Sequence, residues 1–438
     1  MKTVAHVFAL VVALVTALVV GFAPSTARAQ ESAPATLLTE REQSLAREFS
    51  PLPPVPADPT NVYADDPRAA RLGQAFFYDP GFSGPGDVSC STCHEPDLGW
   101  GDGKPLAHTI ELHTRHSPTL LNVAYNRWFF WDGRKDSLWS QALDPIEDPR
   151  EHGFSRLGVA HRIAADPTYA QAYTELFGPL PELSDTRRFP PAGRPVDKQP
   201  EHPHAQAWDS MAIADQRHVD EVYVHFGKAV AAFERQILST RSPYDVFVEG
   251  LEDGDPQKLA ALSESAQRGF ALFVGKGQCF ICHDGPNFTD LEFHSNRAPT
   301  QKLDDGGRAM GIQDLKNDPF NLRSQYADDG GRLGKTRLSI APRSVHFPGD
   351  FKTPTLRNVA RTGPYMHEGQ METLAEVVSF YSTLEGAGPP DPTGENLIQP
   401  RNLSLQEQAD LVAFLESLTD EDLPQELRGP PPGLGPAR

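Results

Sequence analysis

The chain has 438 residues and a formal net charge of −19 at pH 7, from 59 acidic and 40 basic side chains. An acidic surface repels phosphate backbones, which argues against a nucleic acid partner and is compatible with a basic protein partner. A chain of this length is long enough for two or three domains with sizeable cores.

The first 29 residues have the pattern of a secretory signal. Lys2 supplies the positive start, residues 7–22 the apolar run, and residues 27–29 an Ala-x-Ala cleavage site. Because the apolar run is short for a membrane span, we expect cleavage before Gln30 and no stable membrane insertion.

The mature chain divides by composition. Residues 30–60 are polar and proline-rich and are predicted to form an extended leader. We expect an N-terminal domain at residues 61–250, with a surface insertion at about 181–210, and a C-terminal domain at residues 251–425. The tail, residues 426–438, is rich in proline and glycine and is predicted to be disordered.

Apolar side chains recur every three to four residues in four segments, which predicts amphipathic helices. These segments are residues 66–77, 219–237, 262–273 and 404–418. Gly275 is expected to stop the third helix. Ser404 and Glu407 form a capping box for the fourth.

All four cysteines fall in two copies of a Cys-x-x-Cys-His motif, which is the attachment site of a c-type haem. The copies are Cys90, Cys93 and His94, and Cys279, Cys282 and His283. Two thiols bind the porphyrin edge and the adjacent histidine becomes the proximal ligand of the iron. A zinc site made of the four cysteines, or a thioredoxin-like redox pair, leaves both histidines without a role.

The sequence therefore predicts two covalently bound c-type haems. Because such haems are attached outside the cytoplasm, the predicted signal and the motifs together indicate the periplasm. Each half has a helix, a haem motif and further helices, while strand patterns are sparse. We expect a mainly α protein, with two cytochrome c-like haem domains joined by the long helix at residues 219–237, long loops and little strand.

The segments around the haem motifs closely resemble the bacterial di-haem cytochrome c peroxidase/MauG family. Besides the two motifs, the resemblance is carried by residues 129–134, 231–235, 351–359 and 364–369. It runs from about residue 72 to residue 418. It implies an N-terminal haem that reacts with hydrogen peroxide, held by His94, and a C-terminal haem that transfers electrons, held by His283.

The resemblance also implies three further catalytic residues. Trp131 corresponds to the tryptophan between the haems, and Gln141 and Glu151 follow it by 10 and 20 residues, as in the family. A carboxylate beside the open iron position acts on peroxide first as a general base and then as a general acid. Glu147 lies in the same loop, but the Pro-Ile-x-x-Pro-x-Glu pattern favours Glu151.

Some relatives close the peroxidatic iron with a histidine from the loop after the first haem motif. His108, His113 and His116 lie in this loop, without the Gly-His-Gly context of those relatives. We therefore expect an open iron position that needs no reductive activation.

The sixth ligand of the second haem separates the branches of the family. Peroxidases carry a methionine 14 residues after the histidine equivalent to His367, whereas MauG-like proteins carry a tyrosine, and here the residue is Tyr381. Phenolate is a hard donor that stabilises oxidised iron. Met366 and Met371 are the alternative ligands.

The family also binds calcium between its domains, through an asparagine and two carbonyl oxygens. The carbonyl positions correspond to Thr362 and Pro364, whereas the asparagine position is His116. Imidazole is a poor calcium ligand, so a backbone carbonyl or a water would have to replace the asparagine as the third ligand.

These features imply a periplasmic, peroxide-dependent di-haem oxidoreductase of the MauG-like branch. Its electrons are expected from a small cytochrome c or a cupredoxin or, as in MauG, from a protein substrate. The alternative is a non-catalytic di-haem cytochrome c that only transfers electrons. Gln141 and Glu151 argue against this alternative, because an electron carrier needs no acid/base group beside its iron.

Overall fold

The computed structural model describes residues 36–300, 305–340, 349–390 and 397–435. The predicted signal, residues 1–29, lies outside these ranges. Helices dominate the described residues, whose two strands have three residues each. None of the described helices is long and apolar enough to cross a membrane. The expectation of a mainly helical protein with little strand is confirmed.

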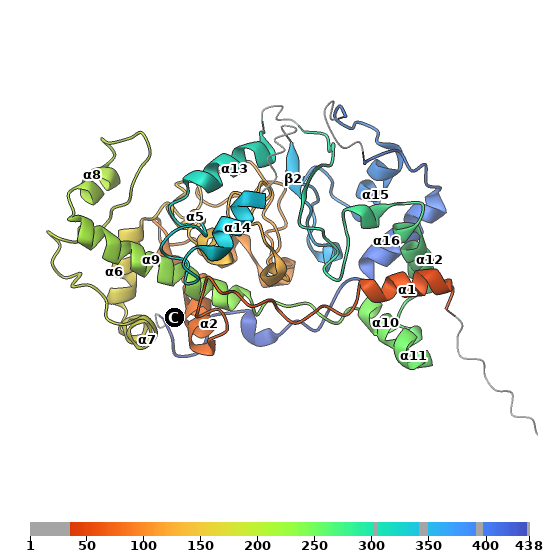
Figure 1. Ribbon diagram of the computed structural model, residues 1–438, viewed down its shortest axis with the longest axis horizontal. Helices are drawn as coiled ribbons and strands as arrows, with labels where there is room; N and C mark the ends of the chain where they lie inside the picture. The colour runs from red at the N-terminus through yellow and green to blue at the C-terminus, as the bar shows by residue number, and fades with distance from the viewer. Residues whose placement is uncertain (1–35, 301–304, 341–348, 391–396, 436–438) are drawn as a thin grey trace, which may run out of the picture. The chain divides into compact units, whose positions relative to one another are not determined.

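The helices and strands follow in the order shown in Figure 1. The α-helices are α1 (Glu40–Glu48), α2 (Pro67–Tyr78), α3 (Cys90–Cys93), α4 (Leu138–Gln141), α5 (Asp144–Glu147), α6 (Arg156–Ala165), α7 (Pro167–Phe177), α8 (Pro203–Asp209), α9 (Ile213–Glu234), α10 (Pro243–Asp253), α11 (Pro256–Leu259), α12 (Glu264–Val274), α13 (Gly307–Asn317), α14 (Arg332–Ile340), α15 (Leu374–Thr383) and α16 (Leu405–Glu416). The strands are β1 (Phe293–Ser295) and β2 (Asp350–Lys352). The four helices predicted from apolar spacing are present as α2, α9, α12 and α16.

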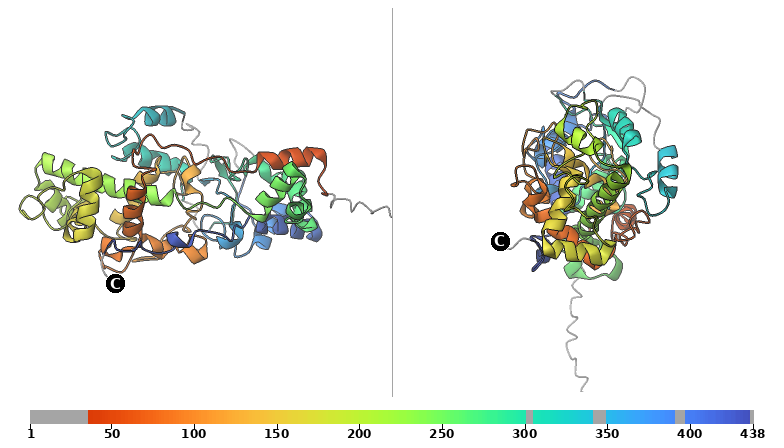
Figure 2. Two further views of the ribbon diagram at one scale, coloured as in Figure 1. Left: turned by 90° about the horizontal axis from the view of Figure 1, so that it is seen from below. Right: turned by 90° about the vertical axis from the view of Figure 1, so that its left-hand side faces the viewer.

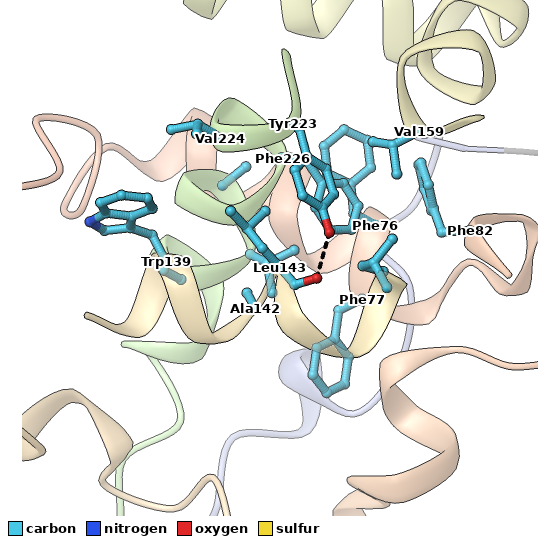
Figure 3. Packing of buried hydrophobic residues seen from close by; sticks show 14 of the residues in the cluster. Phe76, Phe77, Phe82, Trp139, Ala142, Leu143, Val159, Tyr223, Val224 and Phe226 are labelled. Carbon is cyan, nitrogen blue, oxygen red and sulfur yellow. Dashed lines mark hydrogen bonds between the residues drawn. The ribbon is translucent and has the colours of Figure 1, made fainter. Parts of the chain in front are cut away.

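The first core forms around a close crossing of α2 and α9. Gly73 permits this crossing, because a Cβ here would lie 1.8 Å from the carbonyl oxygen of Ala229. Buried rings from both helices surround it: Phe76, Phe77, Tyr223 and Phe226 (Figure 3). Tyr223 also donates a hydrogen bond to the carbonyl oxygen of Leu143. This bond connects α9 to the segment that continues to Glu151.

The second core repeats this arrangement with α12 and α16. Gly269 occupies the crossing, where a Cβ would lie 2.0 Å from the carbonyl oxygen of Asp410. The buried rings of this core are Phe49, Tyr244, Phe270, Phe273, Phe288 and Phe414. In each half, therefore, a glycine brings two helix backbones together shortly before a haem motif.

A second repeated segment, Pro-Thr-Leu-x-Asn-Val-Ala, occurs at residues 118–124 and 354–360. Its asparagines, Asn122 and Asn358, are both left-handed, with φ of 58° and 59°. The Asn122 side chain donates a hydrogen bond to the carbonyl oxygen of Ser239, and the Asn358 side chain donates one to the hydroxyl of Ser239. The equivalent loops of the two halves therefore meet at one serine between α9 and α10.

The long helix α9 ends at Glu234 inside the first core, and residues 235–242 make the connection to the second half. The predicted domain boundary at residue 250 lies within α10. Tyr244 and Phe247 of α10 pack in the second core, so the first half of the fold ends before this helix.

The predicted extended leader contains a helix. Thr39 caps α1 through a capping box with Glu42, and Tyr244 donates a hydrogen bond to the carbonyl oxygen of Ala46. Phe49 follows α1 and lies in the second core. Figures 1 and 2 show α1 beside α10, far along the chain. The proline-rich composition of residues 30–60 predicted no helix here. The residues that pack against α1 come from the C-terminal half, so local composition does not indicate them.

The expectation of a disordered tail is wrong for residues 426–435. Leu427 is buried in the first core, and Tyr78 donates a hydrogen bond to its carbonyl oxygen at 2.7 Å. Gln74 donates to the carbonyl oxygens of Glu426 and Gly429, both at 2.7 Å. Side chains of α2 thus donate hydrogen bonds to the carbonyl oxygens of this proline- and glycine-rich segment. Its residues 426–435 form no α-helix or strand that would pair these groups within the backbone.

The predicted surface insertion, residues 181–210, is partly buried. It carries α8, and both Phe189 and Trp208 lie in the first core. The guanidinium of Arg156 lies 5.2 Å from the centre of a Trp208 ring. Few large apolar residues occur in this segment, but Leu183, Phe189 and Trp208 all pack in the first core.

The two strands of the C-terminal half form a small sheet that contacts the first half. β1 and β2 are antiparallel, with His294 opposite Phe351. The backbone nitrogen of Lys352 donates a hydrogen bond to the carbonyl oxygen of Trp131 at 2.8 Å. This bond connects the C-terminal half to the segment that carries the predicted inter-haem tryptophan.

Candidate active site

One cavity of about 360 Å³ contains residues of both haem motifs. Its lining includes Cys93, His94, Cys279, Cys282 and His283. Cys90 packs against the first core at the edge of the same motif. The cavity is therefore continuous from one attachment site to the other.

The two motif histidines have equivalent surroundings. Nδ1 of His94 lies 3.0 Å from the carbonyl oxygen of Trp100, and Nδ1 of His283 lies 3.1 Å from that of Phe288. Burial lowers the pKa of both imidazoles. A neutral ring that donates Nδ1–H to a carbonyl keeps Nε2 as the metal-binding atom.

The motif cysteines are also suited to haem attachment. None of them forms a disulfide. Burial raises the pKa of the Cys93 and Cys279 thiols to about 12, so they are held as neutral thiols. In both motifs the backbone nitrogen of the histidine donates a hydrogen bond to the carbonyl oxygen of the first cysteine at 3.0 Å. This turn keeps the cysteines and the histidine of each motif close together.

A cationic side chain in the cavity also fits a haem. Lys352 is partly buried and lines the cavity, and burial lowers its pKa to about 8. No carboxylate among the described residues forms an ion pair with it. A haem has two propionates, and such an anion stabilises a buried ammonium group. The residues present therefore fit a haem at each motif.

The acid/base candidates lie on the first half's side of the cavity. Ser137 caps α4, which ends at Gln141, and Glu151 follows α5. Both Gln141 and Glu151 line the cavity. Oε1 of Gln141 is buried and has no hydrogen-bond partner among the described residues. An amide oxygen of this kind is available to a small polar molecule in the cavity.

Glu147 and His152 have other partners. Glu147 forms an ion pair with Arg156 at 2.8 Å and is absent from the cavity lining. Nδ1 of His152 lies 3.0 Å from the carbonyl oxygen of Phe82. Of the two glutamates in this loop, the geometry favours Glu151 as the group that faces a bound haem.

Trp131 lines the cavity where the two halves meet. Its Nε1 donates a hydrogen bond to the carbonyl oxygen of His116 at 2.9 Å. The backbone nitrogen of His116 donates in turn to the carbonyl oxygen of His367 at 2.8 Å. This chain of contacts runs from the first half to the second.

The three histidines of the loop after the first motif differ in their contacts. His108 is exposed. Nδ1 of His116 lies 2.7 Å from the carbonyl oxygen of Lys104. Nε2 of His113 lies 3.1 Å from Oε1 of Glu151. The contact between His113 and Glu151 was not anticipated, because the spacing of two residues in separate loops carries no signal of their approach.

Tyr381 lies on the second half's side of the cavity, on α15. Burial raises the pKa of its phenol, and its hydroxyl has no hydrogen-bond partner among the described residues. Met366 lines the same cavity, with its sulfur 3.6 Å from Nδ2 of Asn296. Met371 is buried and does not line the cavity. Tyr381 and Met366 therefore remain the candidates for the iron.

Thr362 and Pro364 also line the cavity. Their carbonyl oxygens accept no hydrogen bond from the described residues, which leaves them free for a cation. The imidazole of His116 points its Nδ1 at Lys104 instead. The expected calcium site therefore stays a prediction.

A mainly helical fold with a Cys-x-x-Cys-His motif in each half, around one cavity, has the features of the di-haem cytochrome c class. A profile of the di-haem cytochrome c peroxidase family matches residues 67–253. The cytochrome-c peroxidase IdrP1 of Denitromonas iodatirespirans is 33% identical over 391 residues, which cover 85% of this chain and 86% of that protein. The chain therefore belongs to the di-haem cytochrome c peroxidase/MauG family, whose members are peroxidase-type oxidoreductases.

Two further comparisons support this assignment. The methylamine utilization protein MauG of Methylorubrum extorquens is 33% identical over 358 residues, which cover 81% of this chain and 79% of that protein. The crystal structure of a MauG-like protein associated with microbial copper homeostasis has a TM-score of 0.58 at 25% identity. The match covers 87% of this chain and 98% of that one. The predicted family, fold class and enzyme class are confirmed.

Proposed function

We propose that the protein is a periplasmic peroxidase that reduces hydrogen peroxide at the haem held by His94. Electrons enter through the haem held by His283. Each peroxide takes up two electrons and two protons and gives two molecules of water. The observation that carries the proposal is the position of Gln141 and Glu151, both on the first half's side of the cavity.

When bound, the haems supply an iron that binds peroxide and store the electrons that reduce it. The chain supplies the proton transfers. The Glu151 carboxylate takes the proton from one peroxide oxygen and returns it to the other, so that the O–O bond breaks with loss of water. The amide of Gln141 binds the peroxide while this happens.

Trp131 and Tyr381 complete the site. Trp131 lines the cavity that contains residues of both motifs, and we propose that it carries electrons between the haems. Tyr381 is proposed as the second ligand of the iron held by His283. Burial disfavours a free phenolate here, so the charge of the iron would have to stabilise the ionised oxygen.

The electron source is proposed from charge and chemistry. The net charge of −19 favours a basic small cytochrome c or a cupredoxin, and a protein substrate is the second candidate. The haems are proposed to be covalently attached, since all four cysteines lie in the two motifs. A calcium ion at the carbonyl oxygens of Thr362 and Pro364 belongs to the same proposal.

Absorption and electron paramagnetic resonance spectra of the ferric protein test the proposal, recorded before and after one equivalent of peroxide. We expect one high-spin and one low-spin haem, and a rapid spectral change on mixing. Two low-spin haems that do not respond to peroxide would instead identify a non-catalytic electron-transfer cytochrome.

A further inference from the structure

The loop after the first haem motif folds back on itself. The backbone nitrogen of Ala107 donates a hydrogen bond to the carbonyl oxygen of Arg115 at 3.0 Å, and that of His113 donates to Ala107 at 2.7 Å. His108 and Leu112 form an antiparallel bridge nearer the tip. We call residues 107–115 the distal hairpin.

The distal hairpin is hydrogen bonded to the loop that carries Glu151. The hydroxyl of Thr109 lies within hydrogen-bond distance of the carbonyl oxygens of Arg150, at 2.9 Å, and Glu151, at 3.1 Å. The backbone nitrogen of Glu111 donates to the carbonyl oxygen of Arg150 at 3.0 Å. These contacts hold the two loops in one relative position.

This attachment directs the ring of His113 at two carboxylates. Nε2 of His113 lies 3.1 Å from Oε1 of Glu151 and 3.8 Å from Oδ2 of Asp148, and 14% of its side chain is exposed. Arg150 already pairs with Asp148 at 2.6 Å. Arg134, on the neighbouring segment, also faces Glu151 in the cavity. Of these cations, His113 is the one in ion-pair contact with the Glu151 carboxylate.

We propose that His113 is a positioning residue for Glu151, which it holds in the orientation needed to take a proton from peroxide. The inference rests on the proposed function. It also gives His113 a role other than iron ligand, since its Nε2 faces the carboxylates. The catalytic glutamate of this chain is then a member of a His–Glu pair formed by two loops.

The ion pair predicts that the rate constant for peroxide depends on pH. The carboxylates of Asp148 and Glu151 raise the pKa of His113 to about 8, against the opposing effects of burial and of Arg150. His113 therefore carries its positive charge at pH 7 and loses it as the pH rises through about 8. The other titratable groups near Glu151 are His94, His152 and the thiols of Cys90 and Cys93. Burial lowers the pKa of both imidazoles and raises that of both thiols.

The test compares H113Q with H108Q, an exposed change in the same hairpin. In the holoprotein we expect H113Q to lower the second-order rate constant for peroxide on the order of tenfold to hundredfold at pH 7, since misplacing a catalytic group by about 1 Å has such an effect. The fall in this constant above pH 8, present in the native protein and in H108Q, should be absent in H113Q. The ferric spectra of all three proteins should be the same.

Three outcomes would overturn the inference. A rate constant and pH profile of H113Q equal to those of H108Q would show that His113 has no role. A lower rate with the native pH profile would indicate a structural effect alone. A low-spin first haem that becomes high-spin in H113Q would identify His113 as an iron ligand. By contrast, a native protein that does not react with peroxide would refute the proposed function itself.

Discussion

The indole of Trp131 and the imidazole of His367 lie edge to face, with ring centroids 6.5 Å apart and an interplanar angle of 67°. The imidazole also stacks on Phe351, with centroids 3.8 Å apart. These three rings come from both halves of the chain. Trp131 and Phe351 of this aromatic contact line the di-haem cavity.

Trp131 and His367 occupy equivalent positions in two copies of one loop. The residue before each is left-handed, with φ of 63° at Phe130 and 70° at Met366. A left-handed glycine follows two residues after each, and an antiparallel bridge closes each loop. The internal repeat therefore places a tryptophan in one half opposite a histidine in the other.

Replacing Trp131 with Phe should slow electron transfer between the haems. The change removes the indole and its hydrogen bond to the carbonyl oxygen of His116, while the haem ligands stay. We expect native ferric spectra and a slower transfer of electrons from the second haem to the first, measured by stopped-flow absorption. Trp128→Phe is the control, because Trp128 is buried outside the cavity. Equal rates for the two variants would contradict the relay role.

Replacing Glu151 with Gln should lower the rate constant for peroxide by about a hundredfold or more, which is the usual contribution of a general acid/base. The amide keeps the shape of the side chain but cannot accept the proton. Glu111→Gln is the matched control, since Glu111 is exposed in the distal hairpin. Full peroxide turnover by E151Q would refute the acid/base role.

Replacing Tyr381 with Phe should change the spectrum of the low-spin haem and raise its reduction potential, because a phenolate stabilises oxidised iron. Tyr365→Phe is the control, since Tyr365 also lines the cavity but donates its hydroxyl to the carbonyl oxygen of Val359 at 3.1 Å. If the spectrum is unchanged in Y381F, Met366 becomes the candidate ligand.

The buried ion pair of Asp245 and Arg357 should contribute strongly to stability. Its oxygen and nitrogen atoms lie 2.8 and 2.9 Å apart, and neither side chain is more than 4% exposed. We expect Asp245→Asn to lower the free energy of unfolding by about 3–5 kcal/mol, since it leaves a buried charge unpaired. Glu421→Gln is the control, because it removes the exposed partner of Arg361. It should change the free energy of unfolding by less than about 1 kcal/mol.

The same pair predicts a pH dependence. Burial alone raises the pKa of Asp245, but the hydrogen bonds and charge of Arg357 lower it overall. A carboxyl whose pKa is lowered by folding stabilises the protein above its unfolded pKa, about 3.9, and loses this contribution as the pH falls. The free energy of unfolding, measured with a denaturant, should therefore decrease below pH 4 more steeply in the native protein than in D245N. If the free energies of unfolding of the two proteins changed with pH in parallel, the lowered pKa of Asp245 would be contradicted.

Local patterns in the sequence predicted much of the fold because their causes are local. A haem motif needs five consecutive residues, and a capping box such as that of Ser404 and Glu407 needs four. The packing of the leader and the tail depends instead on partners hundreds of residues away. Phe49 and Leu427 are each buried by the opposite half of the chain, which no local composition reveals.

The sequence by itself determined the two haem motifs, the main helices and, through its resemblance to known proteins, the family. Only the tertiary structure decided that Glu151 lines the cavity whereas Glu147 pairs with Arg156, and that His113 faces Glu151. The physical reason is that a motif defines bonding groups along the chain, whereas the direction of a side chain depends on the loops packed against it. Here the hydrogen bonds between two loops select the partner of the proposed catalytic glutamate.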